Sequence, residues 1–127
     1  MNIDQTKAIH GMCMACDPRV QPMDSHKLTE RIWSRILADV PFEDAVDIVA
    51  RLYSRERMIV LQPGMIVEAW EELRAERDKT LRSIASIDRY LALFEATDPP
   101  DVTAERRAQR ARLVEQLPER MRHEQLA

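Results

Sequence analysis

Four side chains in the first part of the chain are of the types that bind zinc. His10, Cys13 and Cys16 lie in the stretch HGMCMAC, and His26 follows as a fourth potential ligand. Thiolate and imidazole groups suit a tetrahedral zinc ion, so these residues form the one metal-like pattern in the sequence. Structural zinc sites usually contain a second CxxC or HxxxH pair, and this chain has none. We therefore expect no metal and no cofactor, and keep a zinc-stabilised module as an alternative.

The same two cysteines form a CxxC motif, which is a redox centre in some proteins. A centre of the thioredoxin type follows a strand and begins a helix, and no strand-like run precedes this motif. On a helix, Cys13 and Cys16 lie one turn apart, so we expect both to pack on the core as small apolar side chains. Free cysteines fit a reducing compartment, and no run is long enough to span a membrane. The expected location is the cytoplasm.

A cluster of arginines near the C-terminus has the chemistry to bind phosphate groups. Its members are Arg106, Arg107, Arg110 and Arg112. Guanidinium groups neutralise phosphates and stack on bases, which makes nucleic-acid binding one interpretation. Glutamates are interspersed, no aromatic residue follows Phe94, and the formal net charge is -3. We therefore expect an ion-paired helix face, with direct nucleic-acid binding as the alternative.

Catalytic patterns are absent from the sequence. Neighbouring acidic residues such as Glu43 and Asp44 point in different directions on a helix, so they belong to exposed faces. No serine or cysteine lies in a nucleophile motif, and no glycine-rich phosphate loop occurs. We do not expect an enzyme.

The elements that position these residues are predicted to be helices. The chain has 127 residues, 45% of them hydrophobic, and only two glycines, which favours an all-α fold. Apolar spacing predicts helices from Asn2 to Cys16, from Leu28 to Val40 and from Phe42 to Tyr53, with another beginning at Pro63. Asp24 or Ser25 is a candidate cap for the second helix. The run MIVLQ at 58–62 is either one short strand or a buried connector.

The first 77 residues are therefore expected to form a core of three to four helices that cross at steep angles. Trp33, Phe42 and Trp70 are its expected anchors. Residues 78–127 are expected to form a helical extension whose C-terminal part is partly mobile without a partner.

From the helix that begins at Pro63 into the extension, an apolar heptad pattern runs from Ile66 to Phe94 and is interrupted at Arg77 and Thr80. Either the helix breaks there, or one long helix presents its distal stripe to a partner. TDPPD at 97–101 ends this helix, because consecutive prolines cannot continue it. A final helix, capped by Asp101 or Thr103 and interrupted at Pro118, is expected to fold back as an antiparallel hairpin. Homodimerisation through the stripe is the alternative.

The stretch from DPR at 17–19 through AWEELRAER at 69–77 resembles the small phage proteins that load and inhibit the replicative helicase. The shared pattern is a helix ending in Trp33, Leu37 and Val40, then PFEDAV, then a helix ending in Leu52 and Tyr53, then Pro63 and Ile66. The resemblance covers roughly the first 77 residues, and the overall length is also similar.

This resemblance implies a non-enzymatic adaptor that contacts the hexameric helicase through its C-terminal part. Such a loader holds the helicase inactive and passes it to an origin-binding initiator protein, which releases it onto single-stranded DNA. The family's tail is often short and unstructured, whereas this chain has two helical patterns there, so a hairpin clamp or dimerisation is an equal expectation. The expected contact residues are Leu81, Ile84, Leu91, Phe94, Arg106, Arg107, Arg110, Arg112, Leu113 and Leu117.

Overall fold

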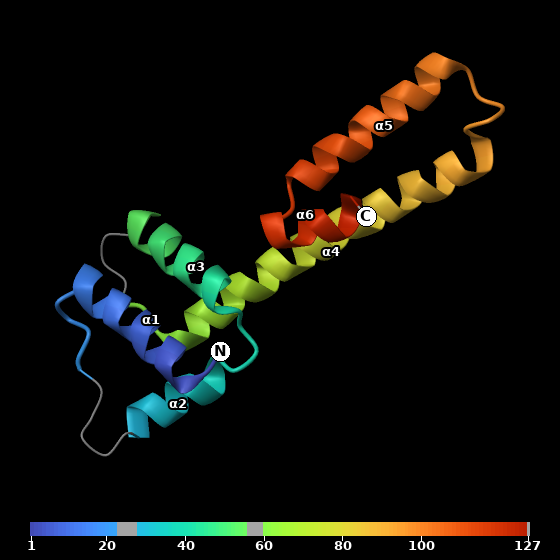
Figure 1. Ribbon diagram of the computed structural model, residues 1–127. Helices are drawn as coiled ribbons and strands as arrows, with labels where there is room; N and C mark the ends of the chain where they lie inside the picture. Colours follow the sequence, from blue (N-terminus) through green and yellow to red (C-terminus); the bar gives the residue numbers. More distant parts are fainter. Residues whose placement is uncertain (23–27, 56–59, 127) are drawn as a thin grey trace. The chain divides into compact units, whose positions relative to one another are not determined.

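The structure is a computed structural model that describes residues 1–22, 28–55 and 60–126. In these ranges the chain forms six helices and no strand, which confirms the all-α prediction. The helices are α1 (Ile3–Cys16), α2 (Leu28–Ile36), α3 (Phe42–Arg55), α4 (Pro63–Phe94), α5 (Pro100–Glu115) and α6 (Glu119–Leu126) (Figure 1). They divide into two compact units, unit 1 (Met1–Leu73) and unit 2 (Arg74–Ala127). The sequence predicts a boundary after residue 77, and in the structure the boundary between the two units follows Leu73.

Helix α1 begins and ends where its sequence predicts. The side chain of Asn2 accepts a hydrogen bond from the Gln5 backbone N–H at 2.8 Å, and the Gln5 side chain accepts one from the Asn2 N–H at 3.0 Å. This reciprocal capping box satisfies two backbone donors that a helix start leaves unpaired. At the other end, Asp17 is extended and its carboxylate forms a salt bridge with Arg19 at 2.8 Å.

Helix α2 is shorter than predicted, because it ends at Ile36 and not at Val40. Residues 37–40 form a tight turn in which the Val40 N–H donates to the Leu37 carbonyl oxygen at 3.1 Å. Pro41 disfavours a helical conformation at Val40, so the helix cannot continue through this turn. The Met1 ammonium donates to the carbonyl oxygens freed by this turn, the closest being that of Ala38 at 2.6 Å.

Two other predictions fall wholly or partly on residues that the structure does not describe. The candidate caps Asp24 and Ser25 lie outside the described residues. Only residues 60–62 of the MIVLQ run are described; they lie outside the helices, and Leu61 is buried at 2% exposure. Val60 is half-buried and Gln62 is exposed, so this part of the run is a partly buried connector into α4, which begins at Pro63 as predicted.

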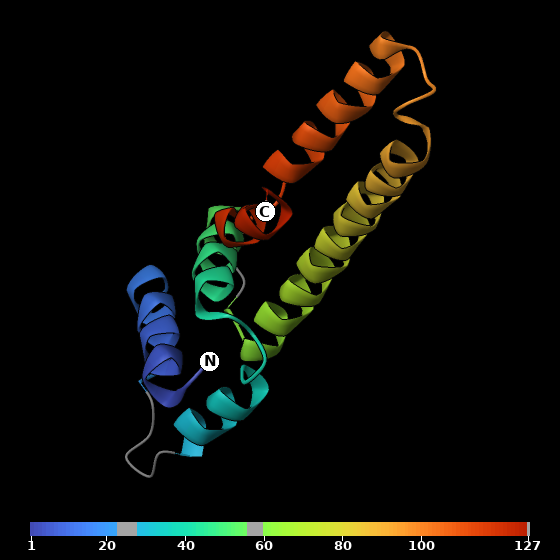
Figure 2. The same cartoon turned by 45° about the vertical axis from the view of Figure 1, so that its right-hand side comes forward.

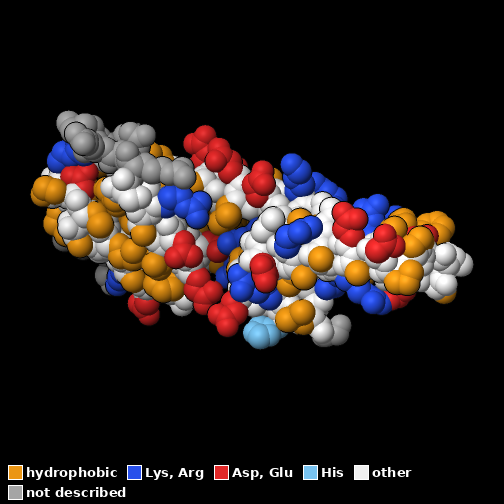
Figure 3. Space-filling view, turned by 90° about the horizontal axis from the view of Figure 1, so that it is seen from above, with side chains coloured by type: hydrophobic (Ala, Val, Ile, Leu, Met, Phe, Trp, Pro, Cys, Tyr) orange, Lys and Arg blue, Asp and Glu red, His pale blue; other side chains and the backbone are white. Residues whose placement is uncertain are grey.

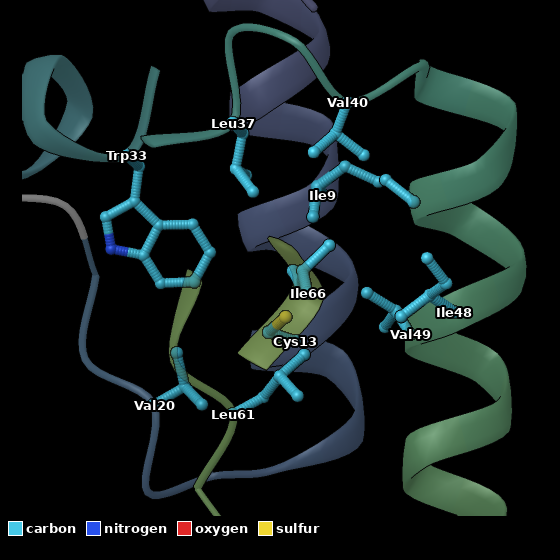
Figure 4. Close-up of a cluster of buried hydrophobic side chains, with 11 residues drawn as sticks. Ile9, Cys13, Val20, Trp33, Leu37, Val40, Ile48, Val49, Leu61 and Ile66 are labelled. Carbon is cyan, nitrogen blue, oxygen red and sulfur yellow. The ribbon is translucent and has the colours of Figure 1, made fainter. Parts of the chain in front are cut away.

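The core of unit 1 is a single cluster to which α1, α2, α3 and the start of α4 all contribute. Figure 4 shows Trp33, Ile9 and Ile66 pointing into the same space. Of the three expected anchors, Trp33 is 7% exposed, whereas Phe42 and Trp70 pack against the cluster and are only partly buried. The fully buried aliphatic side chains Ile9, Leu37, Val49 and Ile66 therefore form the centre, and the aromatic rings lie nearer its edge.

Helix α4 is continuous from Pro63 to Phe94, so the interruption of its heptad pattern causes no break. Thr80 fits within the helix because its hydroxyl donates to the Glu76 carbonyl oxygen at 3.1 Å. After a short turn, α5 runs back beside α4, as both views show, which confirms the predicted hairpin (Figures 1 and 2). Its core consists of Ile84, Val114 and Leu117.

The predicted cap of α5 is wrong. Pro99 occupies the N-cap position, Pro100 is the first helical residue, and no side chain caps the helix. Proline suits this first position, because its missing N–H is a donor that a helix start would leave unpaired. Thr103, one of the expected caps, lies inside the helix and is buried.

Candidate functional site

The zinc-type residues do not form a shared site in the described part of the chain. His10 is 4% exposed and its ring meets the Trp33 ring edge-on, with centroids 4.9 Å apart. Cys13 is fully buried, whereas Cys16 is exposed, so only the first packs on the core as predicted. No group of three or more His, Cys, Asp or Glu residues in the described ranges is arranged to hold a metal. His26 lies outside those ranges.

Burial shifts the pKa values of His10, Cys13 and Tyr53 toward their uncharged forms. It lowers the pKa of His10, an effect that a hydrogen bond with the Gln21 backbone partly opposes. It also raises the pKa of Cys13 to about 11 and that of Tyr53 to about 12. The Tyr53 hydroxyl donates to the Cys13 carbonyl oxygen at 3.5 Å, linking α3 to α1. These shifts favour neutral side chains, which serve packing and not nucleophilic chemistry.

Three of the four clustered arginines bind groups within unit 2. Arg110 donates to the Asp88 carboxylate at 2.5 Å and to the Gln125 carbonyl oxygen at 2.9 Å, joining α5 to α4 and α6. Arg107 forms an ion pair with Glu95. The Arg106 guanidinium carbon lies 4.8 Å from the centroid of the Tyr90 ring. Arg112 is exposed and forms no ion pair with the residues that the structure describes.

The apolar residues expected to contact a partner differ in exposure, and most of them are buried within the hairpin. Ile84 and Leu117 are each 1% exposed, and Leu81 and Leu113 pack against them, so these four form the interior of the hairpin. Leu91 is partly buried. Phe94 is the exception, with 44% of its surface exposed, and Leu93 beside it is 66% exposed. The hairpin thus uses most of the stripe for its own packing and leaves the far end of α4 uncovered.

We call this surface the hairpin end and define it as Tyr90, Leu93, Phe94 and Arg106. The Tyr90 and Phe94 rings lie 5.1 Å apart, and the Tyr90 hydroxyl donates to the Asp98 carboxylate. That hydrogen bond, with burial, raises the pKa of Tyr90. In Figure 3 hydrophobic side chains gather at this end of the hairpin beside both basic and acidic ones. These contacts fix the positions of the two rings and the guanidinium relative to one another.

A second exposed apolar surface lies on α2, where sequence reasoning expected burial. Leu28, Ile32 and Ile36 are 58%, 48% and 42% exposed, although all three belong to the predicted core stripe. The signal for this was present in the sequence. At 100° per residue the stripe from Leu28 to Leu37 spans about 180°, which is wider than the roughly 100° that one core contact covers. We call these three residues the outer face of α2.

The described residues therefore include two exposed apolar surfaces, the hairpin end and the outer face of α2, and no group of three or more of them could hold a metal ion. No described helix combines the length and the apolar character that a membrane crossing requires. Exposed aromatic and branched side chains beside arginines are typical of protein-binding surfaces. Comparisons of the chain with protein-family models, curated proteins and solved structures find no match.

Proposed function

We propose that the chain is a non-catalytic adaptor of phage DNA replication that binds the hexameric replicative helicase in the host cytoplasm. The adaptor would hold the helicase inactive and deliver it to the origin, where an initiator protein takes it over. Two things support the proposal: the resemblance of the first 77 residues to helicase loaders, and a C-terminal hairpin that presents an ordered apolar surface. The folded hairpin favours a clamp-like contact over a tail that folds on binding.

The observation that carries the proposal is the exposure of Phe94 at the hairpin end. Aromatic and arginine side chains dominate the binding energy of many protein interfaces. Phe94 is 44% exposed and contacts Tyr90, which in turn lies beneath Arg106. We therefore centre the helicase contact on the hairpin end, with Arg107 and Arg112 at its margin. Ile84, Leu113 and Leu117 pack inside the hairpin, so they would contribute to its stability and not to the contact itself.

The test is light scattering after size exclusion, on the chain alone and mixed with its host's replicative helicase, with and without ATP. We expect a stable complex that Phe94→Ser weakens at least tenfold. Leu126→Ser is the matched control, because Leu126 is also exposed, at 72%, and lies outside the hairpin end. The absence of any complex in both nucleotide states would refute the helicase proposal.

Experiments on the same protein samples also test two alternative functions, homodimerisation and nucleic-acid binding. A homodimer of the isolated chain that Phe94→Ser dissociates would assign the hairpin end to self-association. Nucleic-acid binding would appear as a salt-dependent mobility shift of single- or double-stranded DNA that is lost when Arg106, Arg107, Arg110 and Arg112 are all changed to alanine. The ion pairs of Arg107 and Arg110 with acidic residues favour a protein partner, because those charges are already neutralised within the chain.

A further inference from the structure

The outer face of α2 is a row of exposed apolar side chains. Leu28, Ile32 and Ile36 are spaced four residues apart, so their side chains follow one line along the helix. Trp33, on the side facing the core, is buried against α1. Exposed apolar side chains in such a row are a recurrent means of helix recognition. The surface lies wholly in unit 1, whereas the residues of the hairpin end belong to unit 2.

Positive charge runs along one edge of this face. Arg31 and Arg35 each precede an isoleucine of the outer face by one position and lie one turn apart, so both occupy the same edge. Both are exposed, and neither forms an ion pair with a residue that the structure describes. Glu30, the single acidic residue of α2, is 7% exposed and lies 3.4 Å from Lys7. It is therefore turned away from the arginine edge.

This charge pattern argues against a second copy of the chain as the occupant. In a symmetric antiparallel pair of α2 helices, the arginine edges of both copies fall on the same side and repel each other. In a parallel pair, the arginines of one copy face the opposite edge of the other, where α2 offers no exposed acid. Like charges across an interface cost free energy and select against the wrong partner. A partner with an acidic edge satisfies both arginines.

We propose that the outer face of α2 binds an amphipathic helix of another protein. The apolar stripe of that helix lies along Leu28, Ile32 and Ile36, and acidic residues on its flank pair with Arg31 and Arg35. A contact with one helix buries less than the roughly 1,200 Å² of a typical stable complex, so the binding is reversible. The inference uses unit 1 alone and stands or falls independently of helicase binding by the hairpin.

The probes are two designed helical peptides that differ only in charge. Both carry three leucines at intervals of four, and one has two glutamates on the flank where the other has two lysines. Fluorescence anisotropy with the full chain should show the glutamate peptide binding about five- to tenfold more tightly, as expected for two exposed ion pairs. The difference should shrink as salt is raised. The double variant Arg31→Glu, Arg35→Glu should reverse the preference.

A second variant tests the apolar part of the surface. Ile32→Ser combined with Ile36→Ser should abolish binding of the glutamate peptide, while Leu126→Ser, the matched exposed change, should leave it intact. Circular dichroism verifies that each variant stays helical. Equal affinity for the two peptides, no reversal, or no binding to the unaltered chain would each overturn the proposal. A dimer of the unaltered chain that the Ile32 and Ile36 changes dissociate would assign the face to a second copy.

Discussion

The His10 ring stands almost perpendicular to the Trp33 indole, at an interplanar angle of 84°, and this contact joins α1 to α2 inside unit 1. The imidazole is buried, and its pKa is lowered from the ordinary value of 6.5. A proton on this ring would place a charge in the core beside an apolar ring. His10 is thus a stability element that responds to acid.

We expect unit 1 to lose stability as the pH falls below about 6.5. The unfolded chain binds the His10 proton more readily than the folded one, so stability is full above that pH and declines toward the lowered folded pKa. Both tryptophans, Trp33 and Trp70, lie in unit 1, so urea unfolding followed by tryptophan fluorescence at pH 5 to 8 measures it. His10→Gln should flatten the profile. His123→Gln, at an exposed position, should not.

Unit 2 depends on a small core, and Leu117→Ala should weaken it strongly. Leu117 is 1% exposed and packs with Ile84 and Val114, so the loss is expected to be about 2 to 4 kcal/mol. Hydrogen exchange should accelerate in α5 and α6, while tryptophan fluorescence of unit 1 changes little. Leu126→Ala, at 72% exposure, is the control. Unchanged exchange in α5 would contradict the hairpin core.

Arg110 ties α6 to the hairpin, and Arg110→Met tests this link while keeping the aliphatic stem. The change removes the contacts with the Asp88 carboxylate and the Gln125 carbonyl oxygen. We expect a loss of about 0.5 to 1 kcal/mol, because the ion pair is partly exposed, and faster hydrogen exchange at the end of α6. Arg112→Met on the same helix should have no such effect. Equal exchange in the two variants would remove Arg110 from this role.

The two cysteines should differ sharply in reactivity. Cys16 is exposed, whereas burial raises the pKa of Cys13 from 9.0 to about 11, which lowers its thiolate fraction about a hundredfold. A thiol reagent at pH 8 should modify one cysteine quickly in the native protein and the second only after denaturation. Cys16→Ser should remove the fast reaction. Two fast thiols in the native chain would show that Cys13 is accessible.

The sequence was informative where a signal is local. Pro63 and the TDPPD turn each act within a few residues, so they located the start of α4 and the break between α4 and α5 without knowledge of packing. The capping box of Asn2 and Gln5 is equally local, but it was not used to place the start of α1. The apolar pattern likewise predicted the hairpin. The early end of α2 involves the Met1 ammonium, which is distant in sequence from the carbonyl groups it binds. Periodicity could not reveal that.

The candidate sites were harder to predict than the helices. A stripe shows which residues are apolar but not what covers them. Ile32 was expected in the core and is 48% exposed, whereas Ile84 was expected to contact a partner and is 1% exposed within the hairpin. The pairing of Arg107 with Glu95 and of Arg110 with Asp88 depends on hairpin register, which the sequence leaves open. Leu93 was missed because it lies off the heptad.

Helix α4 belongs to both units, with Pro63–Leu73 in unit 1 and the remainder in unit 2. Starting a helix is costly, but each added residue extends it at little cost. Whichever unit folds first therefore gives the other an already nucleated helix that grows across the boundary without a new start. The shared helix thus couples the folding rates of the two units as well as joining them covalently. The variant Ala75→Pro interrupts the helix at the boundary, so it should slow the folding of whichever unit forms second.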